Sequence, residues 1–354
     1  MKKSLSLHNG TAITILLFIS CQTAANKHGA QTPVWVYDLE KAFPDRDWVR
    51  VRASGSSQDL AEQAAMNSLA RYFRTDVDGL IQTSETFSQI INDAGGKKTV
   101  SFEQSQDFLQ KVNITTNIRG LIMVQTEQYR AADGTFHVNA RMHRRECAER
   151  YAAMIRENTA VINNLLAFAN SLSAGFEAYQ ALSLAAGLAE VTDNFQNILQ
   201  ILDSTAINRQ PDYGGVNAIK AKLRQVAGAF TVGIALATMD GNDAVPIRRA
   251  IASFLNEKGF RTNEQGQGKY MLRANARFEP IAFPSGLHAC YYYFDAALED
   301  SSGVAIFTFP SESERRNDYN AQRAKQMALE AVELSARKGK FAEAFDAWLG
   351  SLIE

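Results

Sequence analysis

The alternation of apolar and polar residues predicts that the first half of the chain contains a strand followed by a helix. In Asp47–Ser54, apolar side chains are interleaved with Arg50 and Arg52, which is typical of a half-buried strand. Gly55 ends this pattern, and Ser56 or Ser57 can cap the helix that follows. The predicted inner face of that helix consists of Leu60, Ala61, Ala64, Ala65, Leu69, Tyr72 and Phe73.

Further along, the pattern predicts a strand from Asp76 into a Ser/Thr-rich stretch to Gln89, and a short helix over Phe102–Lys111. Strands are predicted over Ile114–Arg130 and Phe136–Met142. Asp133-Gly134 lies between them and is a strong hairpin signal. Polar residues of the last strand alternate with apolar ones, which predicts one solvated face: His137, Asn139, Arg141 and His143.

Residues 145–204 are almost entirely helical in character, because apolar residues recur there at spacings of three and four. A helix of this length is unusual in a globular protein, so we predict an antiparallel helical hairpin that breaks near Ser171–Gly175 or further on.

A second α+β unit is predicted after Pro211–Gly215. It begins with a strand over Phe230–Ala237 and a helix capped by Asn242 or Asp243, which ends at Lys258-Gly259. The remaining predicted elements are strands over Tyr270–Phe278, Ala289–Leu298 and Val304–Phe309, then two helices. Gly266-Gln267-Gly268-Lys269 lacks the spacing and the following helix of a phosphate loop, and we interpret it as a hairpin turn.

These elements predict the α+β class: two small, related sandwiches of sheet and helices, joined by a long helical hairpin. The predicted segments are a signal peptide (1–20), a flexible tether (21–33), a first α+β domain (34–144), a helical connector (145–210) and a second α+β domain with C-terminal helices (211–354). We expect a fragment that begins near Asp212 to fold alone.

The N-terminus has the features of an export signal. Lys2 and Lys3 precede an apolar run over Thr11–Ile19, which is too short to span a bilayer. Phe18-Ile19-Ser20-Cys21 resembles a lipobox, so we predict that Cys21 carries a covalent diacylglycerol. Gln22 follows where Asp would favour the inner membrane, and its presence favours the outer membrane.

Composition and motifs give little support to catalysis. The net charge is −1 and no basic cluster occurs, which argues against binding to nucleic acid. Besides Cys21 the chain has Cys147 and Cys290, which either form a disulfide or are buried thiols. With no HExxH or GxSxG motif, we predict no catalytic residue, no metal site and no cofactor apart from the lipid.

Four consecutive aromatic residues, Tyr291 to Phe294, lie on a predicted strand. Their side chains must alternate between the two faces of the sheet. We predict that Tyr292 and Phe294 face one layer, while Tyr291 and Tyr293 face the other and are candidates for an interface. An ordinary, tyrosine-rich sheet is the alternative.

The segment WVRVRASGSSQDLAEQAAMNSLARYF resembles the opening of the LPP-twenty-like lipoprotein family, and GLIMVQTEQYRAADGTFHVNARM resembles its closing hairpin. The resemblance covers about Val34–Arg150 and implies a small α+β domain without enzymatic activity. The second half resembles a related α+β lipoprotein domain. The expected function is that of a non-catalytic bacterial envelope lipoprotein, anchored to a membrane by its lipid, that binds an envelope protein or peptidoglycan. The alternatives are a flagellum-associated or surface-assembly accessory lipoprotein and a periplasmic enzyme.

Overall fold

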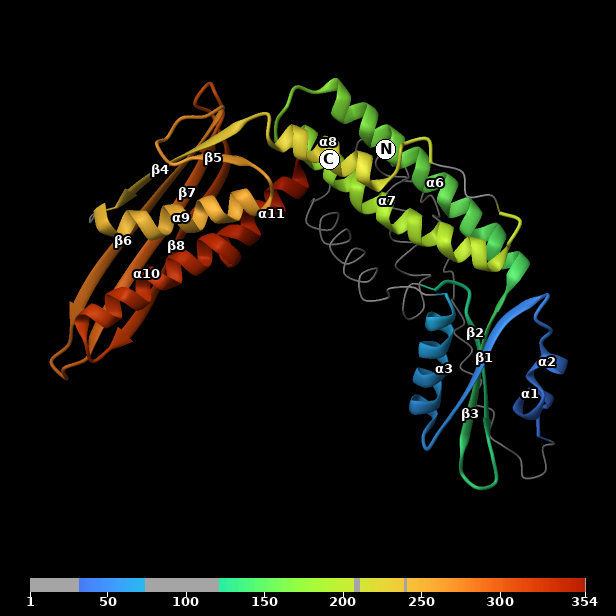
Figure 1. Ribbon diagram of the computed structural model, residues 1–354. Coiled ribbons are helices and arrows are strands. Elements are labelled where there is room, and N and C mark those ends of the chain that lie inside the picture. The colour runs from blue at the N-terminus through green and yellow to red at the C-terminus, as the bar shows by residue number, and fades with distance from the viewer. Residues whose placement is uncertain (1–31, 74–120, 207–210, 239–240, 354) are drawn as a thin grey trace, which may run out of the picture.

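The computed structural model describes residues 32–73, 121–206, 211–238 and 241–353. Two sheets, each packed against helices, lie at the two ends of a helical hairpin (Figure 1). The predicted α+β class is therefore confirmed. Cys21 lies outside the described residues, as do the elements predicted over 76–89 and 102–111.

The first sheet, sheet A, has the order β1-β3-β2 and is antiparallel throughout. Its strands are β1 (Trp48–Gly55), β2 (Gln125–Arg130) and β3 (Phe136–His143). The predicted turn between β2 and β3 is confirmed, and Gly134 has the positive φ of 88° that such turns require.

Helix α3 (Gln58–Tyr72) covers one face of sheet A. The predicted cap is confirmed, because the Ser57 side chain accepts a hydrogen bond from the Leu60 backbone N–H at 3.3 Å. Leu60 and Tyr72, however, are exposed. Each precedes a buried residue and is turned from it by about 100° around the helix. The residues buried on the helix's inner side include Ala61, Ala65, Leu69 and Phe73.

The other face of sheet A carries the polar residues of β3. We predicted that this face is solvated, but in the structure it is covered. Asn139 is fully buried, and the guanidinium of Arg141 lies 4.1 Å from the ring centre of Phe43. The cover is formed by the chain around two short helices, α1 (Val34–Tyr37) and α2 (Leu39–Ala42) (Figure 1). Four-residue helices show no amphipathic period, so the sequence pattern did not reveal this layer.

The helical hairpin has the predicted form. Helix α6 (Arg144–Ser171) and helix α7 (Phe176–Leu202) pack along their length, and the chain reverses at residues 172–175, where the break was predicted. We did not predict α8 (Val216–Ala227), which packs against α7.

The second sheet, sheet B, has the order β5-β4-β6-β7-β8. Strand β4 is parallel to both its neighbours, and the other pairs are antiparallel. In sheet A, by contrast, every described pair is antiparallel, so the described parts of the two sheets differ in strand direction. The strands are β4 (Thr231–Thr238), β5 (Arg261–Asn263), β6 (Tyr270–Ala282), β7 (His288–Glu299) and β8 (Ala305–Asp318).

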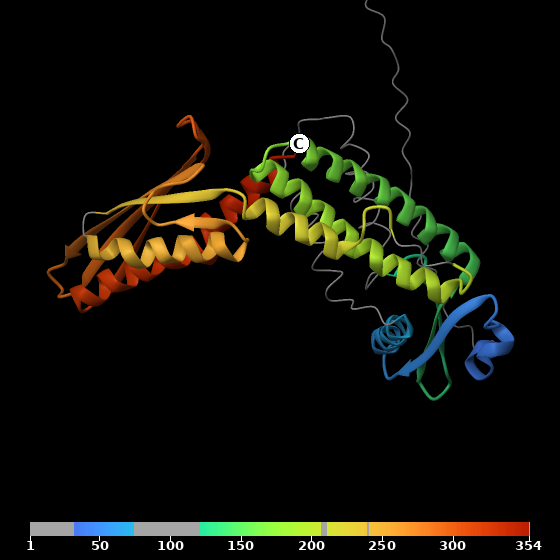
Figure 2. The same cartoon turned by 45° about the horizontal axis from the view of Figure 1, so that its top comes forward.

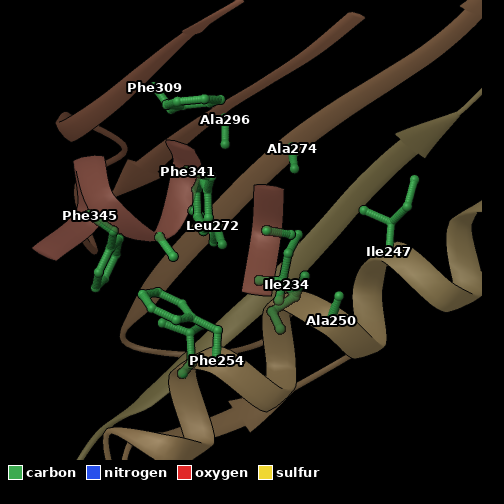
Figure 3. Close-up of a cluster of buried hydrophobic side chains, with 14 of the residues drawn as sticks. Ile234, Ile247, Ala250, Phe254, Leu272, Ala274, Ala296, Phe309, Phe341 and Phe345 are labelled. Carbon is green, nitrogen blue, oxygen red and sulfur yellow. The ribbon is translucent and has the colours of Figure 1, made fainter. Parts of the chain in front are cut away.

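Three helices cover one face of sheet B and bury a large apolar core against it (Figure 3). They are α9 (Gly241–Glu257), α10 (Ala321–Lys338) and α11 (Lys340–Ser351). Helix α9 begins at Gly241, so Asp243 lies in its first turn rather than at its cap. Its predicted end is confirmed, since Gly259 has a φ of 89°.

We predicted a hairpin turn at Gly266–Lys269, and this prediction is wrong. Strands β5 and β6 lie on opposite sides of β4 and do not pair with each other. The connection between them crosses over β4 instead. A Cβ on Gly268 would lie 2.4 Å from the Thr231 carbonyl oxygen, and one on Gly233 would lie 2.9 Å from the Gln267 nitrogen. The crossing therefore depends on two glycines that let the backbones approach each other.

Candidate functional site

The aromatic run of β7 is arranged as its alternation predicted. Tyr292 and Phe294 are buried in the core between sheet B and its helices. Tyr291 and Tyr293 lie on the opposite side and are half-buried. No described helix covers that side of the sheet, which we call the open face (Figure 2).

The open face is held together by its own charged side chains. The Arg277 guanidinium lies 4.5 Å from the ring centre of Tyr293 and forms an ion pair with Glu279 at 3.3 Å. The Arg315 guanidinium lies 6.0 Å from the ring centre of Tyr291. Such contacts are typical of cation–π pairs, so the tyrosines belong to a pre-ordered surface.

At the β4 end of the open face lies a hollow with a volume of about 760 Å³. Its floor includes Ala235, Ala237 and Ala297, whose small side chains leave the strands' backbones close to the surface. Both charges are present around it, together with amide and hydroxyl groups: Arg248, Glu264, Gln265, Arg273, Asn275, Asp295, Glu299 and Thr308.

Two of these polar contacts join neighbouring strands. Arg273 Nε donates to Glu299 Oε2 at 2.8 Å, and Asn275 Nδ2 donates to Asp295 Oδ1 at 3.4 Å. Arg248 is different, because its Nε atom is buried and has no hydrogen-bond partner among the described residues. The hollow thus places a positively charged hydrogen-bond donor beside several hydrogen-bond acceptors, which suits the binding of a polar ligand.

The two remaining cysteines lie in different cores, so the alternative of a disulfide is not realised in the structure. Cys147 lies on α6 in the core beneath sheet A, whereas Cys290 lies on β7 in the core of sheet B, and both are free thiols. Burial raises the pKa of Cys147 from 9.0 to about 11 and also raises the pKa of Cys290. Both thiols are therefore protonated near neutral pH and are poor nucleophiles.

The histidines of β3 have structural partners. His143 Nδ1 accepts a hydrogen bond from the Glu146 backbone N–H at 3.3 Å and so caps α6. His137 Nδ1 lies 2.8 Å from Ser54 Oγ. Within the described ranges, no three side chains of the metal-binding kinds gather closely enough to hold an ion.

Sequence reasoning found part of the open face and missed the hollow. The same alternation that selects Tyr291 and Tyr293 continues to Asp295, Ala297 and Glu299, so these residues could have been found. Nothing in the sequence places Arg248, which comes from α9, beside strand β4.

Nineteen solved chains are similar to this one, including the following three. A lipoprotein from Caulobacter crescentus is 16% identical over 33% of this chain and 89% of its own, with a TM-score of 0.25. A minor lipoprotein from Acinetobacter baumannii is 11% identical over 34% of this chain and 90% of its own (TM-score 0.24), and the secreted protein HP1454 from Helicobacter pylori is 14% identical over 82% and 97% (TM-score 0.34).

TM-scores of this size do not establish a shared fold. No protein-family model matches the chain, and no curated protein matches its sequence. The resemblance to the LPP-twenty-like family therefore stays a prediction. In the part of the chain that the structure covers, no helix has the length and hydropathy to cross a bilayer.

Proposed function

We propose that the protein is a non-catalytic lipoprotein of the bacterial cell envelope, anchored through a diacylglycerol on Cys21, and that the open face of sheet B binds another envelope component. The observation that carries the binding role is the open face itself. One side of sheet B is covered by α9, α10 and α11, while the other presents ordered tyrosines and a polar hollow.

The anchor is supported by the sequence. A charged start, a short apolar run and Phe18-Ile19-Ser20-Cys21 follow one another in the order of a lipoprotein signal. Two acyl chains hold a protein stably on a membrane, which a single chain does not. We favour the outer membrane because Gln22, and not Asp, follows the cysteine.

The anchor is tested by the Cys21→Ala variant. Only the thiol of Cys21 can take the lipid at this position, so the variant should remain an unprocessed precursor that incorporates no labelled palmitate. Cells expressing wild-type protein serve as the reference, and Cys147→Ala serves as a matched cysteine control that should be labelled normally. Equal labelling of Cys21→Ala and wild type would contradict the anchor.

The binding face is tested by photo-crosslinking in living cells. A photo-reactive phenylalanine analogue is placed at Tyr291 or Tyr293 on the open face, and at Tyr319 as the control, because Tyr319 is 82% exposed and lies outside the open face. We expect specific crosslinked products from Tyr291 and Tyr293 only. Their absence at both positions, or the same products from Tyr319, would contradict the proposed face.

A further inference from the structure

Strand β4 has an edge that only part of the sheet covers. Strand β5 pairs with Thr231–Gly233 and then ends (Figure 1). Beyond it, Ile234–Ala237 are hydrogen-bonded to β6 on one side and have no strand partner on the other among the residues described. These four residues also line the hollow.

We propose that the hollow binds the C-terminal end of an extended peptide, which adds to the edge of β4 in line with β5 and whose carboxylate pairs with Arg248. This inference rests on the proposed function, since it takes the open face to be the binding surface. Addition of a peptide strand to a sheet edge is a general mode of recognition, in which backbone hydrogen bonds give affinity and nearby side chains give specificity.

The two edges of sheet B differ in their protection. Strand β8, at the far edge, carries Pro310 at an irregularity in its pairing, followed by Glu312 and Arg315. Prolines, charges and bulges are the usual means of keeping other strands from an edge. The part of β4 without a partner beyond β5 has the sequence Ile-Ala-Leu-Ala and none of these devices. It is therefore the edge that accepts a partner strand.

Arg248 is the reason that we propose a ligand with a free C-terminal carboxylate. Helix α9 packs on the covered side of the sheet, so Arg248 reaches the hollow past the edge of β4. Its Nε is buried without a hydrogen-bond partner among the described residues, which leaves a charged donor for the ligand to satisfy. Guanidinium and carboxylate groups form paired, charge-assisted hydrogen bonds.

A peptide fits this surface better than a glycan does. Sugar binding usually uses the faces of aromatic rings, but Arg277 and Arg315 already lie over Tyr293 and Tyr291. Arg273 is paired with Glu299 and Arg248 is assigned to the carboxylate, so the other charged groups of the hollow are the acidic Glu264 and Asp295. They favour a peptide with basic or neutral side chains over an acidic one.

The test uses residues 21–354 with Cys21→Ala, expressed without the signal segment so that the protein carries neither the apolar run nor the lipid, and two matched arrays of hexapeptides. Both arrays have the same sequences, but one has free C-terminal carboxylates and the other has C-terminal amides. We expect binding to a subset of the carboxylate array, with an affinity loss of about tenfold or more on amidation. Arg248→Ala should cause a similar loss, and Ala237→Trp, which fills the hollow from an exposed position, should abolish binding.

Arg249→Ala is the matched control, because this arginine is the exposed neighbour of Arg248 on α9 and does not line the hollow; binding should stay within about twofold. Thermal melts check that each variant is folded. Absence of binding to both arrays, or binding that is unaffected by amidation and by Arg248→Ala, would overturn the proposal. So would selective binding to an oligosaccharide array that Ala237→Trp abolishes. Crosslinking through Tyr293 does not depend on these arrays, so it can succeed where the peptide proposal fails.

Discussion

At the scale of single residues, Tyr151 joins the helical hairpin to sheet A. Its hydroxyl is fully buried and accepts a hydrogen bond from the Ile122 backbone N–H at 3.1 Å. Its ring packs edge-to-face on Phe195 of the partner helix, with ring centres 5.4 Å apart. One side chain of α6 thus satisfies a buried backbone donor that would otherwise have no partner.

Tyr151→Phe should therefore destabilise the protein by about 1–3 kcal/mol, because it keeps the ring and leaves the Ile122 N–H buried without an acceptor. Chemical denaturation of the two proteins measures the difference. Tyr319→Phe removes the same hydroxyl from an exposed position and should change the free energy of unfolding by less than about 0.5 kcal/mol. Equal effects of the two substitutions would show that the hydrogen bond contributes nothing.

The buried thiols predict a specific reactivity. Below pH 9, Cys147 and Cys290 should react with iodoacetamide slowly in the native protein and rapidly after denaturation, because both are buried and protonated. Mass spectrometry of the Cys21→Ala chain counts the modified thiols. If neither cysteine is modified when the protein is denatured without a reducing agent, the two form a disulfide instead.

The raised pKa of Cys147 also makes the free energy of unfolding depend on pH. The folded state holds the thiol proton up to about pH 11, whereas the unfolded chain releases it near 9.0. The contribution of Cys147 to the free energy of unfolding is present below pH 9 and is lost as the pH rises from 9 to 11. Cys147→Ala should remove this part of the pH dependence, measured as the change in unfolding midpoint across that range relative to the parent chain.

At the scale of elements, the crossing of β4 depends on two glycines. Gly268→Ala would place a Cβ 2.4 Å from the Thr231 carbonyl oxygen and 2.6 Å from the Gly233 nitrogen, so backbone must move. We expect a loss of about 1–3 kcal/mol, measured by chemical denaturation. Gly303→Asn is the control, because nothing lies near that Cβ position and Asn tolerates its positive φ. Unchanged stability of Gly268→Ala would contradict the close crossing.

Local patterns predicted most elements, and long-range pairing explains the errors. The break at residues 172–175 and the alternation of Tyr291 and Tyr293 follow from periodicity within one segment. Strands β5 and β6 could either pair with each other or lie on opposite sides of β4, and the choice depends on residues far apart in the sequence. Gly266–Lys269 resembles a turn in both cases. Helix α8 was missed because no element was predicted between the break at Pro211–Gly215 and the strand that begins at Phe230.

The candidate site shows the same division. Tyr291 and Tyr293 were predicted, since a strand's period places them together. The hollow was not, because it forms where β5 ends early and where Arg248 reaches past a strand edge. Both conditions arise only when α9 and sheet B have been assembled, so no single segment carries a signal for them.

At the scale of the whole molecule, the hairpin belongs to the cores of both sheets. Near one end, Tyr151 and Phe195 pack with sheet A. At the other, Phe176 and Tyr179 pack with sheet B. The middle of the hairpin forms its own cluster with α8, which includes Ile219. The predicted connector over 145–210 is thus a structural part of the units that it joins.

Phe176 is the centre of the contact between the hairpin and sheet B. Its ring lies 5.0 Å from that of Phe260, and it also contacts the rings of Phe230, Tyr270, Phe345 and Trp348. Phe176→Ala should therefore cost about 3–5 kcal/mol of stability. Phe168→Ala, on the exposed side of α6, is the matched control and should cost much less. Similar midpoints of denaturation for the two variants would contradict this role.

This contact changes the outcome that we expect for fragments of the chain. A fragment that begins at Asp212 contains sheet B and its helices but lacks Phe176 and Tyr179, so Phe230 and Phe260 would lose ring contacts. We therefore expect fragment 212–354 to melt without a cooperative transition and to bind a hydrophobic dye, whereas fragment 144–354, which keeps the hairpin, should melt cooperatively. Calorimetry of both fragments and the full mature chain makes the comparison. A cooperative transition of fragment 212–354 at the temperature seen for fragment 144–354 would show that sheet B folds independently of the hairpin.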